Sequence, residues 1–340
     1  MKIREIAKQI GVSPSTVSCV LNNRSGVSNE RREYISKLLI ENGYTIKTAD
    51  EKQSGSILLI RYKSSNHLMD SSDTFFTRIV EGIEATCQSF GYSLNLSIAN
   101  HKTLPSVFSR AIDNGTCGIL FLGSEYEISD TSILKNSTLP LVAIDNRFSN
   151  DAINCVDMDN REGIFAAIQL LYSLGHRKIG YGMSHIQIGS MAERTNAYYD
   201  ALRTLNLECN PSYVADLSPF SKLASEQFLK YLHKQDALPT AYIAGNDTIA
   251  AGIMKAVHEF GLKVPDDISV IGFDDNDICT LLSPQLTTLK INNFEIGRQA
   301  VCRLNQLILD KDSSITRTSV SVELIVRGSV KNISAENDKN

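Results

Sequence analysis

Apolar residues near the start of the chain recur with the spacing of short helices. Four of them stand three and four positions apart, as on one face of an amphipathic helix: Ile3, Ile6, Ala7 and Ile10. Gly11 follows at a position where helices commonly end. Ser13 and Pro14 then provide an N-cap residue and a proline at the first helical position. The pattern predicts two short helices separated by a tight, glycine-containing turn.

The second predicted helix has an apolar inner face and a polar outer face. Its inward positions are Val17, Val20 and Leu21. Its outward positions are mostly small hydroxyl residues: Ser15, Thr16, Ser18, Cys19 and Asn22. After Ser28 the spacing predicts a third, supporting helix that ends near residue 42. The apolar face of this helix consists of Ile35, Leu38 and Leu39.

This arrangement of helices is typical of a helix-turn-helix unit, although a three-helix structural cap would share its periodicity. The hydroxyl-rich outer face favours DNA, because small polar side chains can approach phosphates and base edges closely. The distribution of charge also favours DNA binding by this segment. Residues 1–50 contain eight Lys and Arg against five Asp and Glu, whereas the rest of the chain contains 26 basic residues against 33 acidic ones. This contrast between a basic N-terminal segment (the head) and an acidic remainder (the body) predicts that only the head binds a polyanion.

From residue 56 onward, short β-branched or aliphatic runs alternate with helical stretches. The predicted strands lie at 57–61, 94–98, 118–122, 141–144, 178–181, 213–215, 241–244, 268–271 and 320–326. The predicted helices lie at 75–90, 107–112, 163–174, 191–205, 221–232, 248–260 and 296–309. Regular alternation predicts parallel sheets with helices on both faces, and its restart after Asp157 predicts two such doubly wound lobes.

Polar residues directly follow several of these strands, at the edge of an open α/β sheet where ligands bind. They are Asp145, Asn246, Asp247, Asp274 and Asp275, with Arg194 on the helix after the strand at 178–181. Carboxylates, an amide and a guanidinium group converging on a cleft can bind vicinal hydroxyls through paired hydrogen bonds. The structural alternatives are helix N-caps at Asp247 and Asp275, and a solvated or ion-paired role for Arg194.

Composition limits the class of protein. A chain of 340 residues with 42% hydrophobic residues is long enough for two or three domains. Its apolar runs are shorter than a membrane span, and its N-terminus has no apolar segment of signal-peptide length. Its seven cysteines form no CxxC pair, which is typical of reduced thiols. We therefore expect a cytoplasmic protein. The sequence contains no GxSxG, GxxxxGK[ST] or HExxH motif, and Asp274, Asp275 and Asp277 lack the rest of a calcium loop. We therefore expect no catalytic residues, no metal and no cofactor.

Several ordered stretches resemble the DNA-binding head of the lactose/galactose repressor (LacI/GalR) family. They are IREIA at 3–7, GVS at 11–13, TVS at 16–18, VLN at 20–22, VS at 27–28, RR at 31–32 and GY at 43–44. The resemblance continues to Arg327-Gly328-Ser329 and covers nearly the whole chain. It implies a helix-turn-helix head at 1–45, a linker at 46–56, a two-lobed, periplasmic-binding-protein-like ligand-binding and dimerisation domain at 57–330, and a disordered tail at 331–340.

The function implied by the resemblance is that of a homodimeric transcriptional regulator, most often a repressor. It would bind double-stranded operator DNA, and a small carbohydrate between the lobes would control its operator affinity. The alternatives are a purine or nucleoside corepressor in the same class of regulator, and a sugar-binding protein that does not bind DNA. No membrane partner is expected.

The resemblance also assigns residues to two sites. DNA contacts are expected from Ser13, Ser15, Thr16, Ser18, Cys19, Asn22, Arg31 and Arg32. Effector contacts are expected from Phe75, Phe76, Asp145, Arg194, Phe220, Asn246 and Asp274. An aromatic face against a sugar ring would exclude water and orient the ring.

Two departures from the family pattern bear on DNA recognition. Cys19 stands where the family often has arginine or tyrosine, so this position offers no bidentate contact to guanine. Residues 45–56 lack the Ala-Arg-x-Leu hinge helix that inserts a leucine into the minor groove, and Asp50 and Glu51 would face phosphates instead. We therefore predict weakened or altered selectivity at the central base pairs of the operator, and looser coupling between the two sites.

Overall fold

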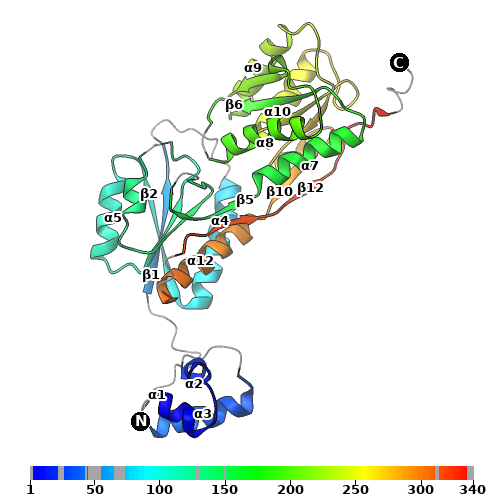
Figure 1. Cartoon of the computed structure of the whole chain (residues 1–340). Coiled ribbons are helices and arrows are strands. Elements are labelled where there is room, and N and C mark those ends of the chain that lie inside the picture. Colours follow the sequence, from blue (N-terminus) through cyan, green and yellow to red (C-terminus); the bar gives the residue numbers. More distant parts are fainter. Residues whose placement is uncertain are drawn as a thin grey trace. The chain divides into compact units, whose positions relative to one another are not determined.

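The computed structural model describes residues 3–21, 27–42, 44, 55–64, 73–127, 130–148, 151–187, 189–310 and 314–334 (Figure 1). The chain divides into two compact units, a head that extends to Gly55 and a body that contains nearly all of the rest. Within the described residues, no helix combines the length and the apolar character that crossing a membrane requires.

The head is a three-helix unit, as expected. Its helices are α1 (Ile3–Gln9), α2 (Pro14–Leu21) and α3 (Asn29–Glu41). Six apolar residues, each at most 1% exposed, form its core: Ile6, Ala7, Val17, Val20, Ile35 and Leu39. Gly11 has a φ of +67° in the turn between α1 and α2, a conformation that glycine adopts without strain.

The first lobe of the body is built on a six-stranded sheet in the order β11-β5-β4-β3-β1-β2. Its strands are β1 (Gly55–Tyr62), β2 (Tyr92–Ala99), β3 (Gly118–Leu122), β4 (Leu141–Ile144), β5 (Asn154–Met158) and β11 (Arg317–Val320). Its helices are α4 (Asp73–Phe90), α5 (Leu104–Asp113), α6 (Ser132–Lys135) and α12 (Asn293–Asp310). The pairs β1–β3, β3–β4, β4–β5 and β5–β11 are parallel, and α5 and α12 cover opposite faces (Figure 1).

The second lobe is built on a four-stranded parallel sheet in the order β7-β6-β8-β9. Its strands are β6 (Ile179–Ser184), β7 (Val214–Leu217), β8 (Ala241–Ala244) and β9 (Ser269–Ile271). Its helices are α7 (Asn160–Ser173), α8 (Ser190–Thr204), α9 (Ser221–Leu232), α10 (Asp247–Glu259), α11 (Ile278–Leu281) and the 3₁₀ turn η1 (Pro211–Tyr213). The pair α7 and α8 covers one face, and the pair α9 and α10 covers the other (Figure 1). The prediction of two doubly wound lobes is confirmed.

The end of the chain crosses back between the lobes. After α12 packs on β3, β4 and β5, β11 joins the edge of the first-lobe sheet. Next, β12 (Val322–Ile325) pairs antiparallel with β10 (Thr288–Ile291). The chain then reaches the second lobe, where the amide of Val270 donates a 2.9 Å hydrogen bond to the carbonyl of Ser329. This is the return crossing that the resemblance implies.

Three strand predictions need correction, and one of them is that β10, at Thr288–Ile291, is absent from the predicted strands. The strand expected at 320–326 is two strands, β11 and β12, because the chain leaves the first-lobe sheet and enters a separate ribbon. The strand β5 was not predicted, because Asn154 and Asp157 interrupt its apolar pattern. Both side chains are nevertheless buried, since β5 lies between β4 and β11.

Two domain boundaries also shift. The strand β1 begins at Gly55, within the expected linker at 46–56, of which residues 46–54 lie outside the described residues. The expected tail at 331–340 is packed on the body at its start, because the amide of Lys331 donates to Ser269 Oγ at 3.0 Å. The amide of Ile333 continues this attachment, while residues 335–340 are not among those described.

Candidate functional site

The start of α2 is fixed by two hydroxyl residues. The Oγ of Ser13 accepts a 3.1 Å hydrogen bond from the backbone N–H of Thr16, which makes Ser13 the N-cap predicted from the sequence. The hydroxyls of the same two residues are hydrogen-bonded to each other at 2.8 Å. The side chains of Ser13 and Thr16 are therefore held at the N-terminal end of the helix.

The remaining expected DNA-contact residues lie on the surfaces of α2 and α3. Ser18 and Cys19 on α2 are partly buried, as is Arg32 on α3, whereas Arg31 is exposed. Asn22 and the side chain of Ser15 lie outside the described part of the chain. The described residues thus present short polar groups on one helix and guanidinium groups on the next, a combination suited to phosphates and base edges.

A cavity lies in the body and receives residues from both lobes. The first lobe contributes Arg61, Tyr62, Phe75, Phe76, Leu122, Ser124, Glu125 and Asp145. The second lobe contributes Ser190, Met191, Arg194, Asn246, Thr248, Asp274 and Asn276, and Met158 lies where the chain passes between the lobes. Many of these residues follow the carboxyl ends of parallel strands, which is where open α/β sheets bind ligands.

All but one of the effector residues expected from the sequence line this cavity: Phe75, Phe76, Asp145, Arg194, Asn246 and Asp274. Phe220 does not line it. The strand β7 ends at Leu217, and Phe220 is the N-cap residue of α9, with a partly buried ring. The structure therefore does not bring Phe220 to the cavity with the others.

Arg194 is almost completely buried, with 3% of its surface exposed. Its Nε donates to Asn160 Oδ1 at 2.8 Å, and its Nη1 donates to the carbonyl oxygen of Gly245 at 2.7 Å. The same Nη1 lies 3.2 Å from Asp274 Oδ1, and the guanidinium carbon lies 3.6 Å from the centre of the Phe273 ring. These contacts fix the plane of the guanidinium group, so Arg194 is ion-paired and buried rather than solvated.

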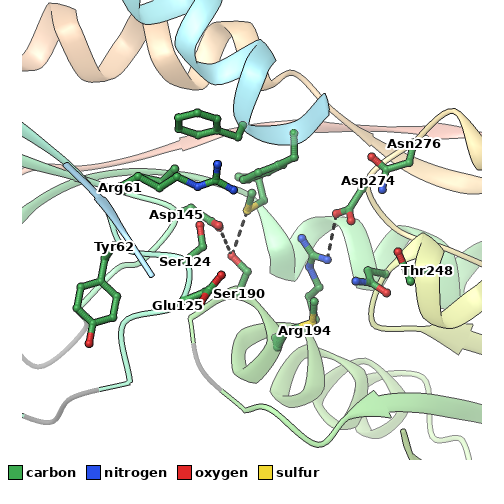
Figure 2. A pocket seen from close by; sticks show the side chains of 16 residues that line it. Arg61, Tyr62, Ser124, Glu125, Asp145, Ser190, Arg194, Thr248, Asp274 and Asn276 are labelled. Carbon is green, nitrogen blue, oxygen red and sulfur yellow. Dashed lines mark hydrogen bonds and ion pairs between the residues drawn. The ribbon is translucent and has the colours of Figure 1, made fainter. Parts of the chain in front are cut away.

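Asp145 and Ser190 connect the two lobes inside the cavity. Ser190 Oγ donates a hydrogen bond of 2.6 Å to Asp145 Oδ1 (Figure 2). Asp145 follows β4 with a φ of +57°, and Ser190 begins α8. Burial raises the pKa of the Asp145 carboxyl, while the hydrogen bond from Ser190 and the charge of Arg194 act in the opposite direction.

The residues considered as helix caps have different roles from those expected. Asn246, not Asp247, is the N-cap of α10, and its side chain accepts a 2.9 Å hydrogen bond from the amide of Ile249. Asn246 therefore has a structural role in addition to its place in the cavity wall. Asp275 is not a cap either, because its carboxylate pairs with Arg327 at 2.6 Å.

Two neighbouring carboxyl groups have raised pKa values. Asp247 is fully buried and accepts hydrogen bonds from Thr288 Oγ1 at 2.6 Å and from the amide of Asn276 at 2.8 Å. Burial raises its pKa to about 6. Burial likewise raises the pKa of Asp274 to about 7, although the Arg194 charge opposes this shift. Asp274 is therefore able to exchange a proton near neutral pH when a ligand changes its surroundings.

Arg61 is a cavity residue that the sequence reasoning missed. It lies near the end of β1, and its guanidinium carbon is 4.0 Å from the centre of the Phe76 ring. Figure 2 shows its side chain approaching the cavity from the first lobe, opposite Arg194 of the second. The signal that pointed to Asp145, a polar residue at the carboxyl end of an apolar strand, also applies to Arg61 and would have found it.

Comparison with known proteins places both units in one family. Residues 2–46 match the bacterial regulatory proteins of the lacI family, and residues 168–330 match the periplasmic binding protein-like domain. The HTH-type transcriptional repressor PurR of Haemophilus influenzae is 30% identical, over 97% of this chain and 99% of its own length. The HTH-type transcriptional repressor CytR of Escherichia coli is also 30% identical, over 97% of this chain and 96% of its own length.

Solved structures show the same fold at lower identity. The Lac repressor dimer bound to operator and the anti-inducer ONPF superposes with a TM-score of 0.70 at 24% identity, covering 97% of this chain and 99% of that one. The regulator CelR in complex with cellobiose gives a TM-score of 0.70 at 21% identity, with the same coverage. Together with the 30% identity to full-length repressors, these matches show a DNA-binding transcriptional repressor controlled by a small ligand, and the chain belongs to the LacI/GalR family.

Proposed function

We propose that the cavity in the body binds a carbohydrate and that this binding changes the affinity of the head for its operator. The observation that carries the proposal is that several polar side chains, each held by hydrogen bonds within the protein, line the same cavity. Arg194 and Asp274 contribute from the second lobe, and Asp145 contributes from the first. A guanidinium group between carboxylates offers paired donors and acceptors, which match neighbouring hydroxyls on a sugar ring.

Ligands of related structures support a sugar. CelR is solved with cellobiose, and a LacI family regulator from Enterococcus faecium is solved with bound ribose at 22% identity to this chain, a TM-score of 0.66 and coverage of 82% of this chain and 99% of that one. A purine or nucleoside is the alternative, since the cavity contains Phe75 and Phe76, whose rings are suited to stacking. The ring of Phe76 already packs against Arg61, which leaves it less free for a base.

The control of DNA binding follows from linkage. A ligand that binds one arrangement of the two lobes more tightly shifts the body toward it, and the operator affinity then changes by the same factor as the ligand affinity changes on DNA. Ser190 and Asp145, which are hydrogen-bonded to each other, both line the cavity, so a ligand that bridges the lobes would act on this link. We expect the ligand to act as an inducer, which lowers operator affinity.

The head would act on duplex DNA through α2. This helix would enter the major groove, while Thr16, Ser18 and the basic side chains of Arg31 and Arg32 would hold phosphates. One head makes few contacts, so two copies on a near-palindromic operator are expected. Exposed apolar residues support a self-contact: Leu96 and Ile98 on β2 are 53% and 60% exposed, and Leu281 on α11 is 82% exposed. The protein would act by binding alone, without turnover of its ligand.

A thermal-shift screen of the full chain against sugars and nucleosides tests the effector class, because a bound ligand raises apparent stability by mass action. We expect a sugar to raise the melting temperature and to weaken the binding of operator fragments. The variant Arg194→Met should lose both responses, whereas Arg203→Met on the outer face of the same helix should keep them. Stabilisation by nucleosides alone would favour the alternative effector.

A further inference from the structure

Arg61 occupies the first-lobe side of the cavity. It lies near the end of β1 and is one of the lining residues, with its guanidinium group stacked on Phe76 at 4.0 Å. The N–H groups of a guanidinium lie in its own delocalised plane, and an aromatic ring next to the guanidinium carbon does not accept their conventional hydrogen bonds. The contact with Phe76 therefore leaves the hydrogen-bond donors of Arg61 available to a ligand in the cavity.

The other charged groups of the cavity already have protein partners. Arg194 binds Asp274, and Asp145 accepts from Ser190. Glu125, which is 8% exposed, accepts a 3.0 Å hydrogen bond from the amide of Ser64. Each of these groups keeps a hydrogen-bond partner when the cavity holds no ligand.

Arg61 differs from these groups. Among the described residues it forms no hydrogen bond and no ion pair, and its guanidinium carbon lies over the Phe76 ring, 4.0 Å from the ring centre. A partly buried guanidinium with open donors has the fork geometry that matches a phosphate or a carboxylate with two parallel hydrogen bonds. Asp145 and Asp274 oppose an anion only weakly at this position, because burial raises the pKa of both and Asp274 is in addition ion-paired with Arg194.

We propose that the effector is an anionic sugar, a polyol that bears a phosphate or a carboxylate, and that Arg61 binds its charged group. This inference rests on the proposed carbohydrate function and adds the charge of the ligand to it. The hydroxyls would face Arg194, Asp274 and Asn246 in the second lobe, and the anionic group would face Arg61 in the first lobe. A ligand bound at both ends would draw the two lobes together.

Matched ligands test the inference on the full-length protein. Glucose is compared with glucose 6-phosphate and glucuronate, and ribose with ribose 5-phosphate, by thermal shift and by calorimetric titration. Inorganic phosphate at the same concentration measures any stabilisation caused by anions on the basic head. We expect an anionic sugar to bind more tightly than its neutral parent and to exceed the effect of inorganic phosphate. The phosphate and carboxylate arms then identify which anion is preferred.

Variants of Arg61 make the test specific. Arg61→Gln should weaken the binding of the anionic sugar about 10- to 100-fold, as expected when hydrogen bonds to a charged group are lost, and this loss should be clearly larger than the loss for the neutral parent. The affinity of Arg61→Lys for the anionic sugar should lie between those of the unchanged protein and of Arg61→Gln. Lysine keeps the positive charge but cannot form the two parallel hydrogen bonds of a guanidinium group. Arg110→Gln, an exposed arginine on α5, is the matched control and should bind like the unchanged protein.

Three results would overturn the inference. The first is that neutral parents bind as tightly as their anionic partners, and the second is that Arg61→Gln leaves the affinity for anionic sugars unchanged. In either case the effector is still a carbohydrate. If no sugar of either kind stabilised the protein or released operator DNA, the carbohydrate function itself would fail together with the inference.

Discussion

The hydroxyl of Ser190 donates a hydrogen bond to the carboxylate of Asp145, with 2.6 Å between Ser190 Oγ and Asp145 Oδ1. The two residues belong to different lobes. They are 45 positions apart in the sequence, and each lies at the terminus of its own element. Asp145 is 6% exposed and Ser190 is 7% exposed, so water does not readily replace either partner. This hydrogen bond is a direct link between the two halves of the effector site.

The first prediction concerns that link. Ser190→Ala should lower the free energy of unfolding by about 1–3 kcal/mol, because it removes a donor from a buried carboxylate. Urea denaturation measures the change. Ser173→Ala, whose hydroxyl donates only to a carbonyl of its own helix at an exposed position, should change stability by less than about 0.5 kcal/mol. Equal effects of the two substitutions would contradict the assigned role of the link.

The second prediction concerns the buried ion pair. Arg194→Met should cost about 3–5 kcal/mol of unfolding free energy, since Asp274 and the carbonyl of Gly245 lose their shared donor inside the body. Arg203→Met, on the same helix but 68% exposed, breaks only a surface pair with Asp200 and should cost less than about 1 kcal/mol. Denaturation of both variants gives the comparison, and a cost for Arg194→Met as small as that of the control would contradict the prediction.

The third prediction is the pH dependence of stability. The folded-state pKa values of Asp247, about 6, and Asp274, about 7, lie above the ordinary value for aspartate. Between these values and about pH 4, the folded protein holds protons that the unfolded chain has released, so stability should increase as the pH falls from 8 to 5. At lower pH the trend should reverse, because Asp200 and Asp151 have lowered pKa values. When these carboxylates are protonated, they lose their interactions with neighbouring cations, and stability decreases.

Substitution separates the contribution of one group to this pH profile. Asp274→Asn cannot titrate, so the gain in stability between pH 8 and pH 6 should be smaller in this variant than in the unchanged protein. Thermal denaturation over the pH range measures both. Stability that rises steadily from pH 5 to pH 8 in the unchanged protein would show that these two carboxyl groups do not dominate the profile.

The fourth prediction concerns the basic surface of the head. Arg31 is exposed on α3, and its loss should remove one phosphate contact. Arg31→Gln should therefore weaken binding to all DNA sequences to a similar degree and reduce the slope of log affinity against log salt by about 1. Lys230→Gln, an exposed lysine on α9 of the body, is the control and should leave the slope unchanged. Fluorescence anisotropy at several salt concentrations distinguishes the two.

The fifth prediction concerns the centre of the operator. Because residues 45–56 lack a leucine that could act as a wedge, operators that differ only in their central base-pair step should bind with affinities within about threefold of one another. A set of synthetic operators with TA, CA and GC central steps tests this. A strong preference for an easily kinked step would show that this protein deforms its operator by another route.

Much of the fold and of the cavity was predictable because it depends on local signals. Apolar strands followed by polar residues located Asp145, Asn246 and Asp274, since the carboxyl ends of parallel strands meet at one edge of a sheet. The helices of the head were predictable from apolar spacing and from the cap at Ser13. These features arise from residues close together in sequence.

Other features depend on contacts between distant segments. Asn154 and Asp157 interrupt the apolar pattern of β5, so the sequence does not indicate a buried strand there. Its burial results from its position between β4 and β11. Phe220 looked like a cavity residue, although it begins a helix away from the cavity. The place of Arg61 near the end of a strand is visible in the sequence, whereas its contact with Phe76 of α4 depends on how distant segments pack.

The place of β11 in the sheet has a consequence for how the protein is made. This strand completes the first lobe with residues 317–320, and α12, which covers the same sheet, spans Asn293–Asp310. The ribosome therefore synthesises all of the second lobe before it delivers the last pieces of the first. During translation, the part of the first-lobe sheet that α12 covers, over β3, β4 and β5, and the edge at β5 remain exposed until these last segments are made. A nascent chain that stops before residue 293 therefore exposes apolar surface that can aggregate.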